Sequence, residues 1–528
     1  MDTLIKNIIS GNEVELADSL LTFTKNYEAQ QKFDELNHDN LRKDVWEGLF
    51  QRLEQAKYFT VHERCLQVLR ILSRDKTNLD DLATKERLNL IVKNAGLANV
   101  ATSKRTNTFT SVTTVALKLL CNLLYNSAVV QKSIGETSCL PCIVNRMNIY
   151  DEGTPHEVKL FDTRILFLAT ALNVPLRNVV KNELNGDLCL IDMLDQLAIT
   201  FESKGSTIKD DDIMLACEIL KGLFNLYINS DDSVIEQPDG HKDLVKILYK
   251  LLVNGKLHGS TKDDELQSNI INLLTVVPYG CYDSIIRPAR GVDGEIAYQD
   301  TDMTAVHKLL KFLDQRLDMK TELVENISPV MTALIRLVKS ERSIRKYVRL
   351  QVLPPLRDVM KRPEEGSTLR AKLCKLLTSP LKSLCDLVAE FIFVLCKENV
   401  SRMVKYTGYG NAAGMFANKG LLGRNQLSNS SAYSSESEDS DTEEYVRYKE
   451  NINPVTGCYE HPKPNPLEGM SDEQKEFEAM KLVGLVDQLT RQGIVQPCRI
   501  GEDGKPKPIE HILELQEELP KLNVNKSE

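Results

Sequence analysis

From the first residues to about residue 400, apolar residues recur every three or four positions. In CLQVLRILSRDK at 65–76 they include Leu66, Leu69 and Leu72, and FDTRILFLATALN at 161–173 shows the same spacing. This spacing places apolar side chains on one face of an α-helix, whereas a half-buried strand alternates at every second position. No stretch alternates Val, Ile and Thr with polar residues over a sustained length. The pattern therefore predicts an all-α fold without a substantial sheet.

Parts of this helical region repeat. LKLLCNLLYNS at 117–127 matches LKGLFNLYINS at 220–230 without a gap, and LQSNIINLLTVVP at 266–278 has a related pattern. Each follows a shorter helical piece and a polar loop, which is typical of armadillo/HEAT repeats of about 40–47 residues. One helical hairpin cannot bury its apolar face alone, so stacked neighbours share a continuous core. Residues 1–400 are therefore predicted to form an armadillo/HEAT-like superhelical solenoid with a concave inner surface.

Asparagines recur at the same place in these segments, as Asn122, Asn225 and Asn272. An amide inside an apolar helix is costly unless it finds hydrogen-bond partners. One explanation is a hydrogen bond to a helix cap or to a neighbouring repeat. The other is a ladder of amides on the concave face, which could pair with the backbone of a bound segment. The repetition favours the second explanation.

Basic residues also recur where the inner surface is expected. Arg70 and Arg74 lie four positions apart in one predicted helix, and 336–362 is rich in Lys and Arg, including Arg345 and Arg349. A solvated helix face explains such residues without a function. Alternatively they form a positive patch that attracts an acidic peptide or a carboxylate terminus. Nucleic acid is not expected as a partner, because no aromatic residues are interleaved as stacking platforms.

The composition changes after residue 400. Residues 401–424 are rich in Gly and small residues and are expected to form a loop segment or a short irregular packing segment. The acidic, Ser-rich and then Pro-rich stretch 425–470 is expected to be a disordered, phosphorylatable linker. Residues 493–528 are expected to be a flexible tail.

Between the linker and the tail, residues 471–492 predict an amphipathic helix. Ser471 and Gln474 form a capping-box pattern. Phe477, Met480 and Val483 follow at helical spacing. A tethered helix of this kind either docks back on the solenoid or reaches a partner.

The composition excludes several classes of function. The 528 residues carry a formal net charge of −9, and charged residues make up 27%, which lacks the basic excess of a nucleic-acid binder. No apolar run is long enough for a membrane span, and the N-terminal residues do not resemble a signal peptide. A cytoplasmic protein with buried, reduced cysteines is expected. The CxxC pair Cys139 and Cys142 has no second pair at metal-ligand spacing, so neither a metal nor a cofactor is expected.

Several segments together resemble the synembryn family, the chaperones and guanine nucleotide exchange factors of heterotrimeric G protein α subunits (Gα). YTGYGNAAG at 406–414 and the run from NINPVTG at 451–457 to NPLEGMSDEQKEFEAMKLV at 465–483 are the most specific. Further matching stretches are LRILSRDK at 69–76, LLCNLLYNS at 119–127, PHEVKLFDTRILFL at 155–168, QVLPPLRDV at 351–359, AEFIFVLCKE at 389–398 and SDTEEY at 440–445. The resemblance spans nearly the whole chain and is weakest in the loops and near the C-terminus.

The resemblance implies a function. Synembryns bind GDP-loaded or nascent Gα without its βγ partner, promote GDP release, hold the nucleotide-free form and dissociate when GTP binds. The family's groove takes the C-terminal helix of Gα, and its tethered helix braces the nucleotide-binding domain. The implied groove residues are Arg70, Arg74, Asn122, Asn225, Asn272, Arg345 and Arg349, and the implied brace is Phe477, Met480 and Val483. We expect a non-enzymatic monomer in the cytoplasm that is recruited to the cell cortex.

The resemblance also implies phosphorylation by an acidophilic protein kinase. Ser435 is followed three residues later by Glu438, and Ser440 by Glu443. Thr442 lies in the same run but has a tyrosine at that place. Each phosphate adds about −1.5 to −2 charges, so we expect the modified segment to dock on the basic stretch 336–362.

Two alternatives remain open. An armadillo-type adaptor or transport scaffold that binds an acidic peptide would share the asparagines and basic groove but would have no need for the tethered helix. An enzyme is not expected, because the histidines are scattered and the chain has neither an HExxH nor a GxSxG motif. The chain also lacks a GxxxxGK[ST] phosphate loop, so a nucleotide would belong to the partner.

Overall fold

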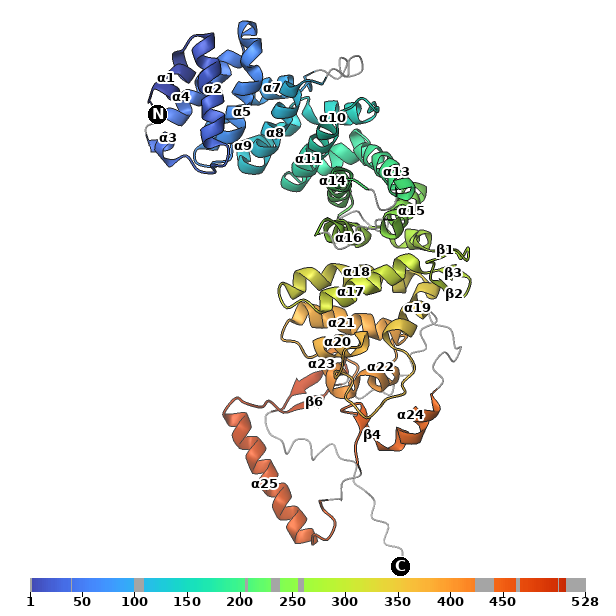
Figure 1. The fold of residues 1–528 in the computed structure, drawn as a ribbon. Coiled ribbons are helices and arrows are strands. Elements are labelled where there is room, and N and C mark those ends of the chain that lie inside the picture. The colour runs from blue at the N-terminus through green and yellow to red at the C-terminus, as the bar shows by residue number, and fades with distance from the viewer. Residues whose placement is uncertain are drawn as a thin grey trace, which may run out of the picture. The chain divides into compact units, whose positions relative to one another are not determined.

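The computed structural model describes residues 2–38, 40–98, 109–204, 208–228, 238–254, 261–422, 441–461, 466–501 and 503–509. It divides into two compact units, Met1–Ile286 and Arg287–Glu528. Each is built from short helices stacked in sequence order (Figure 1). The all-α, armadillo/HEAT-like architecture predicted from the sequence is confirmed, and the strands are two or three residues long.

The first unit consists of two layers of helices. The inner layer is α2 (Glu13–Tyr27), α5 (His62–Leu72), α8 (Ser111–Asn126), α11 (His156–Leu172), α14 (Asp210–Tyr227) and α16 (Thr261–Leu274). The outer layer is α1 (Asp2–Ser10), α4 (Leu41–Leu53), α7 (Lys85–Asn94), α10 (Cys139–Met147), α13 (Gly186–Lys204) and α15 (Pro238–Asn254). Successive inner helices pack side by side, and each also packs against an outer helix. This arrangement buries the apolar face that no single hairpin could bury.

Short elements connect the layers. They are α3 (Asp34–His38), η1 (Ala56–Val61), α6 (Leu79–Leu82), α9 (Ala128–Ser133), η2 (Ile134–Glu136), α12 (Pro175–Asn178), η3 (Val179–Glu183) and η5 (Tyr279–Ile285). Polar residues set where the longer helices begin. Asn12 forms a capping box with Glu15 at the start of α2, and Thr110 does the same with Thr113 at the start of α8, which satisfies N–H groups that have no partner within the helix.

A buried ion pair connects α10 to α11. The Arg146 Nε atom donates to Asp162 Oδ2 at 2.8 Å, and its Nη2 atom donates to the other carboxylate oxygen. Tyr150 also donates to Asp162, at 2.6 Å, and Arg146 Nη1 donates to the Ala95 carbonyl after α7, at 2.9 Å. A buried charge pair is tolerated only when its hydrogen-bonding groups are satisfied. The network therefore joins the ends of α7 and α10 to α11.

The second unit begins with a three-stranded antiparallel sheet in the order β1-β3-β2, formed by β1 (Arg287–Pro288), β2 (Ala297–Tyr298) and β3 (Thr301–Asp302). Five helices follow: α17 (Thr304–Leu317), α18 (Leu323–Ser340), α19 (Arg342–Val352), α20 (Leu369–Leu376) and α21 (Lys382–Leu395). α18 packs against α17, α19 and α21, so it forms the centre of this unit.

The prediction of a loop at 401–424 is wrong for most of that segment. Residues Val400–Thr407 form α22 and Tyr409–Lys419 form α23. Between them, Gly408 has φ 75°, and a Cβ atom there would lie 2.9 Å from the Val455 carbonyl oxygen. The glycine therefore allows a close backbone contact between packed segments. The sequence analysis had interpreted it as a sign of a loop.

The described parts of the predicted linker and tail also contain ordered elements. Residues 441–461 form α24 (Glu443–Tyr448), η6 (Lys449–Asn451) and a hairpin of β4 (Ile452–Asn453) and β5 (Cys458–Tyr459). After α25 (Asp472–Arg491), β6 (Cys498–Ile500) pairs with β7 (Pro506–Pro508). Backbone contacts hold both hairpins against the rest of the unit, because Tyr459 N donates to Val359 O and Leu422 N donates to Gly504 O.

Within the described ranges, no single helix is long and apolar enough to cross a membrane. α8 and the α9–η2 segment would reach the required length together, but they are bent by 106° at their junction. No group of three or more His, Cys, Asp or Glu side chains among the described residues could hold a metal ion. Cys139 and Cys142 are both buried free thiols in α10.

Candidate functional site: a groove on the inner layer and an exposed helix

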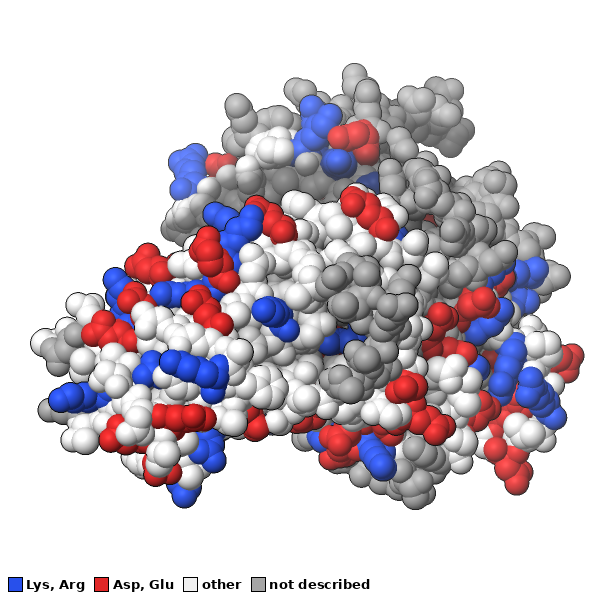
Figure 2. Space-filling model, turned by 90° about the horizontal axis from the view of Figure 1, so that it is seen from above, with Lys and Arg blue, Asp and Glu red and all other residues white. Residues whose placement is uncertain are grey.

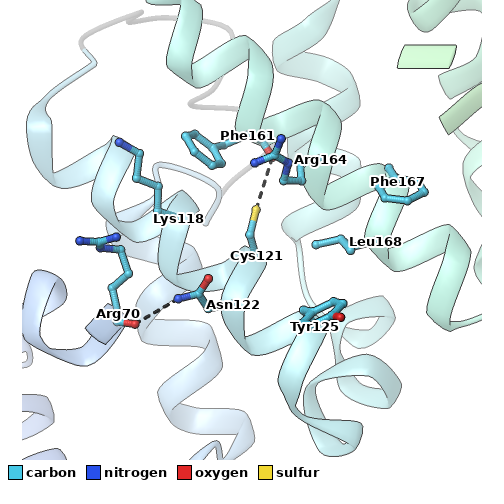
Figure 3. Close-up of a pocket in the computed structure, with 9 residues that line it drawn as sticks. All are labelled: Arg70, Lys118, Cys121, Asn122, Tyr125, Phe161, Arg164, Phe167 and Leu168. Carbon is cyan, nitrogen blue, oxygen red and sulfur yellow. Dashed lines mark hydrogen bonds between the residues drawn. The ribbon is translucent and has the colours of Figure 1, made fainter. Parts of the chain in front are cut away.

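Side chains from α5, α8 and α11 line a surface groove of about 420 Å³ on the inner layer (Figure 3). Its lining consists of Arg70, Lys118, Cys121, Asn122, Tyr125, Phe161, Arg164, Phe167 and Leu168. On α8, Lys118, Asn122 and Tyr125 follow one another at intervals of four and three residues, so they share one face of the helix. The groove therefore arises directly from the helical periodicity of two neighbouring inner helices.

All three predicted asparagines lie on helices of the inner layer, and two of them connect neighbouring helices. Asn122 Nδ2 donates to the Arg70 carbonyl at 3.0 Å and to Ser73 Oγ at 3.2 Å (Figure 3). Asn225 repeats this geometry on α14, with bonds of 3.1 Å to the Phe167 carbonyl and to Thr170 Oγ1.

Both amide groups thus donate within the solenoid, which supports the inter-repeat explanation. The sequence analysis favoured a ladder of amides that are free to pair with a bound backbone. For Asn122 and Asn225 these bonds do not show such a ladder. Asn272, on α16, is half-buried. Within the described chain its side chain makes no hydrogen bond.

Four basic residues of the inner layer are paired with acidic ones. The pairs are Arg70–Glu28 at 2.8 Å, Lys118–Glu157 at 2.8 Å, Arg164–Glu218 at 2.8 Å, and Lys221 with Glu218 and Glu265, each at 3.4 Å. Lys/Arg and Asp/Glu side chains are likewise interspersed on the face seen in Figure 2. Arg70, the one member of the predicted positive patch among them, is therefore part of a row of ion pairs, because acids on adjacent helices accompany each of these cations.

The pairs differ in how firmly they are held. Glu218 is nearly fully buried, and its hydrogen bond raises the pKa of Arg164 although burial alone would lower it. Both Arg164 and Lys221 contact this one carboxylate. Glu28 and Glu157 are more exposed than the cations they contact. The exposed acids can therefore be replaced by groups of a partner more easily than Glu218 can.

Arg70 and Arg74 do not lie on one helix as predicted. α5 ends at Leu72, and Arg74 lies in the turn that follows. Arg74 Nη1 donates to the carbonyls of Glu28, at 2.5 Å, and Gln30, at 3.3 Å. Burial and the nearby charge of Arg70 lower the pKa of Arg74, and Glu28 opposes them. Arg74 therefore holds the chain after α2, and of the two only Arg70 lines the groove.

Aromatic side chains, which the sequence analysis did not single out, lie close to the charged groups in and beside the groove. Tyr125 is 63% exposed. Lys118 Nζ and the Arg164 guanidinium lie 5.3 and 5.5 Å from the ring centroid of Phe161, and Lys221 Nζ lies 5.7 Å from that of Phe167. The sequence did contain a signal for the two lysines, because the repeat match that aligns the asparagines also aligns Lys118 with Lys221. The aromatic residues of α11 had no such signal.

Arg345 and Arg349 belong to the second unit, on α19. Arg345 Nη1 donates to the Val338 carbonyl at 2.9 Å, and Arg349 is buried with Nη2 at 3.4 Å from Tyr406 Oη. These contacts join α19 to α18 and α22. The two arginines therefore belong to a different unit from the groove residues of α5, α8 and α11.

The predicted helix at the end of the chain is present as α25, and its capping box forms as expected. Ser471 N donates to Gln474 Oε1 at 3.1 Å, and Gln474 N donates to Ser471 Oγ at 3.3 Å. Phe477 and Met480 are each 67% exposed, and Val483 is half-buried. Leu482 and Leu485, which the sequence analysis missed, are exposed as well. An unusually large share of the apolar side chains of α25 thus faces solvent.

Of the predicted phosphorylation sites, Ser435 and Ser440 lie outside the described residues. Thr442 is described and begins α24, where its hydroxyl donates to the Leu356 carbonyl and accepts from Tyr445 N at 3.1 Å. Asp441 contacts Lys405 at 2.7 Å and Lys449 at 3.1 Å. The segment that follows the two serines therefore lies against the end of the basic stretch 336–362.

Comparison with known proteins gives a consistent result. Residues 65–505 match the family model described as "guanine nucleotide exchange factor synembryn" (Ric8). The chain is 38% identical to chaperone Ric-8A of Xenopus tropicalis over 523 residues, which cover 96% of each chain. It is 37% identical to chaperone Ric-8A of Gallus gallus, covering 97% of this chain and 96% of the relative, and 35% identical to chaperone Ric-8 of Drosophila pseudoobscura pseudoobscura, covering 97% of each. The chain belongs to the synembryn (Ric8) family of guanine nucleotide exchange factors.

Proposed function

We propose that this protein is a guanine nucleotide exchange factor and folding chaperone for heterotrimeric G protein α subunits. It binds GDP-bound or nascent Gα free of βγ, promotes GDP release, stabilises the nucleotide-free state and dissociates when GTP binds. The observation that carries the proposal, within a chain of this family, is the groove of α5, α8 and α11. Its partly exposed aromatic side chains and paired cations suit an amphipathic helix with a polar end.

The composition of the groove favours a helix over an acidic peptide. A carrier of acidic peptides needs cations that are available along an extended backbone, whereas each of the groove cations discussed above contacts an acid of the chain itself. The groove instead offers the apolar surface of three aromatic side chains, Tyr125 on α8 and Phe161 and Phe167 on α11. In the proposed complex they contact the apolar face of the C-terminal helix of Gα. Binding draws that helix away from the rest of Gα, which removes support from the nucleotide pocket of Gα.

α25 supplies a second contact in the proposed mechanism. Its side chains Phe477, Met480 and Val483 brace the nucleotide-binding domain of Gα. The connection within one chain raises the effective concentration of this second contact once the first has formed. Exchange then requires no bond chemistry by this protein. A ligand that binds the open, nucleotide-free form more tightly than the closed form shifts the population by that difference in affinity.

We also propose that an acidophilic kinase regulates this region through Ser435 and Ser440. The segment that follows them is anchored by Thr442 to Leu356, beside the exposed cations Arg357 and Lys361. Phosphates added just before this anchor would meet those cations and form charge-assisted hydrogen bonds. The expected consequence is a firmer attachment of the segment that leads to α25.

Nucleotide uptake tests the proposal. Purified Gα loaded with GDP is mixed with GTPγS, with and without this protein, and the initial rate of GTPγS uptake is measured. We expect the protein to raise the rate, because it stabilises the state between GDP release and GTPγS binding. Added βγ should suppress the gain, because the protein binds Gα free of βγ. An unchanged rate for every Gα class tested would contradict the proposal.

A further inference from the structure

One acidic side chain contacts both arginines at the edge of the groove. Arg70 Nη2 lies 2.8 Å from Glu28 Oε1, and Arg74 Nη2 lies 3.8 Å from the same oxygen. The two guanidinium groups thus share a single carboxylate. Positive charge exceeds negative charge in this cluster, which is also why the charge of Arg70 depresses the pKa of Arg74.

The Arg74 side chain is held in place by contacts that do not involve the Glu28 side chain, and Arg70 is held in this way at its backbone. Arg74 donates to the backbone carbonyls of Glu28 and Gln30, and the backbone of Arg70 is fixed by the bond from Asn122. The Glu28 side chain is 53% exposed, against 23% for Arg70 and 17% for Arg74. The carboxylate is therefore the most exposed of the three charged groups and the one that a partner can reach most easily.

We infer that Glu28 is an internal counter-ion that the partner's terminal carboxylate displaces from Arg70 and Arg74. This inference rests on the proposed function, in which the groove takes the C-terminal helix of Gα. The end of such a helix carries both a terminal carboxylate and the negative end of the helix dipole. Arg70, which lines the groove, is placed to meet that negative end, and Glu28 competes for it.

The competition lowers the affinity of the groove for a terminal carboxylate. An exposed ion pair contributes little stability, so exchanging one carboxylate for another at Arg70 is nearly neutral. A segment without a terminal carboxylate leaves Glu28 on its arginines, so its affinity does not depend on Glu28. Glu28 thus reduces the preference of the groove for a chain terminus over an internal helix. Glu218 cannot act in this way, because it is buried between Arg164 and Lys221.

Peptide binding to the full-length protein tests the inference. The probes are the C-terminal helix peptide of Gα with a free carboxylate and the same peptide with a C-terminal amide, and the variants are Glu28→Gln and Glu136→Gln. Glu136 pairs with Lys85 at 2.5 Å, is similarly exposed and does not line the groove. Glu28→Gln should tighten binding of the carboxylate peptide by roughly two- to fivefold, the range expected for one exposed ion pair. Binding of the amide peptide should stay the same, and Glu136→Gln should change neither.

The possible outcomes separate the inference from the proposed function. If the wild-type protein binds the peptides but Glu28→Gln tightens both equally or neither, the inference is overturned while the groove assignment stands. If the wild-type protein binds neither peptide, both are overturned. Thermal unfolding of Glu28→Gln should match that of the wild type, because the backbone carbonyl of residue 28 still accepts from Arg74.

Discussion

Replacing Phe477 and Met480 of α25 with glutamine is expected to reduce the stimulation of GTPγS uptake at least about tenfold. Both side chains are 67% exposed, so most of their surface is open to solvent in the free protein. Their apolar area therefore becomes useful only when a partner covers it, and truncation of central interface residues typically costs about 2 kcal/mol or more. Glutamine is a good helix former, so α25 should remain helical. The measurement is the initial rate of GTPγS uptake by Gα with each variant.

A second pair on the same helix provides the control. Leu482 and Leu485 are also exposed and have the same spacing of three residues, but they start five residues later and so face a different side of α25. Leu482→Gln with Leu485→Gln should retain most of the stimulation. Equal losses for both pairs would mean that the helix acts through its whole circumference, and full activity of the Phe477/Met480 variant would remove α25 from the mechanism.

Tyr125→Ala is expected to weaken binding of the C-terminal helix of Gα by about ten- to thirtyfold. Tyr125 is 63% exposed at one end of the groove, where Lys76 Nζ lies 5.1 Å from its ring centroid. A large, rigid aromatic side chain beside a groove is the type of residue that dominates binding energies. Because little of the ring is buried in the free protein, the free energy of unfolding should hardly change. Calorimetric titration with the helix peptide measures the effect.

Phe59→Ala is the matched control for this variant. Phe59, in η1, is 68% exposed in the same unit and does not line the groove. Its removal should leave peptide affinity unchanged. An equal loss of affinity in both variants would show that the measurement responds to exposed aromatic residues in general, and an unaffected Tyr125→Ala variant would place the partner helix elsewhere on the protein.

The helical framework was predictable because it depends on local periodicity. Leu66, Leu69 and Leu72 are all buried on α5, as their spacing indicated. The capping box of Ser471 and Gln474 was also predicted and confirmed, because its two hydrogen bonds join residues only three positions apart. Such features follow from neighbouring residues alone.

The chemistry of the groove was less predictable because it depends on residues far apart in the sequence. Glu28 and Arg70 are separated by 42 positions, and nothing in the local pattern indicates that they meet. The repeated asparagines were recognised correctly as a feature of the inner layer, but their partners lie on the preceding repeat, about 50 residues away in the case of Asn122 and Ser73. Sequence alone could not show whether a polar group faces a partner or a neighbouring helix.

Glycine positions caused the clearest error in the predicted fold. The segment 401–424 contains α22 and α23, and Gly408 between them permits the close approach of the Val455 carbonyl. A glycine that allows flexibility and one that allows close packing are the same letter in the sequence. Only the packing of 452–459 against this region distinguishes them.

The account as a whole depends on a difference in affinity between nucleotide states of one partner. The most direct measurement is the dissociation constant of this protein for Gα in its GDP-bound, nucleotide-free and GTPγS-bound forms, at one salt concentration. The account predicts that the nucleotide-free form binds tightest, by roughly a hundredfold, near the upper end of the usual range of coupling free energies. Equal affinity for the three forms would contradict it, because a ligand without a preference among states cannot shift their populations.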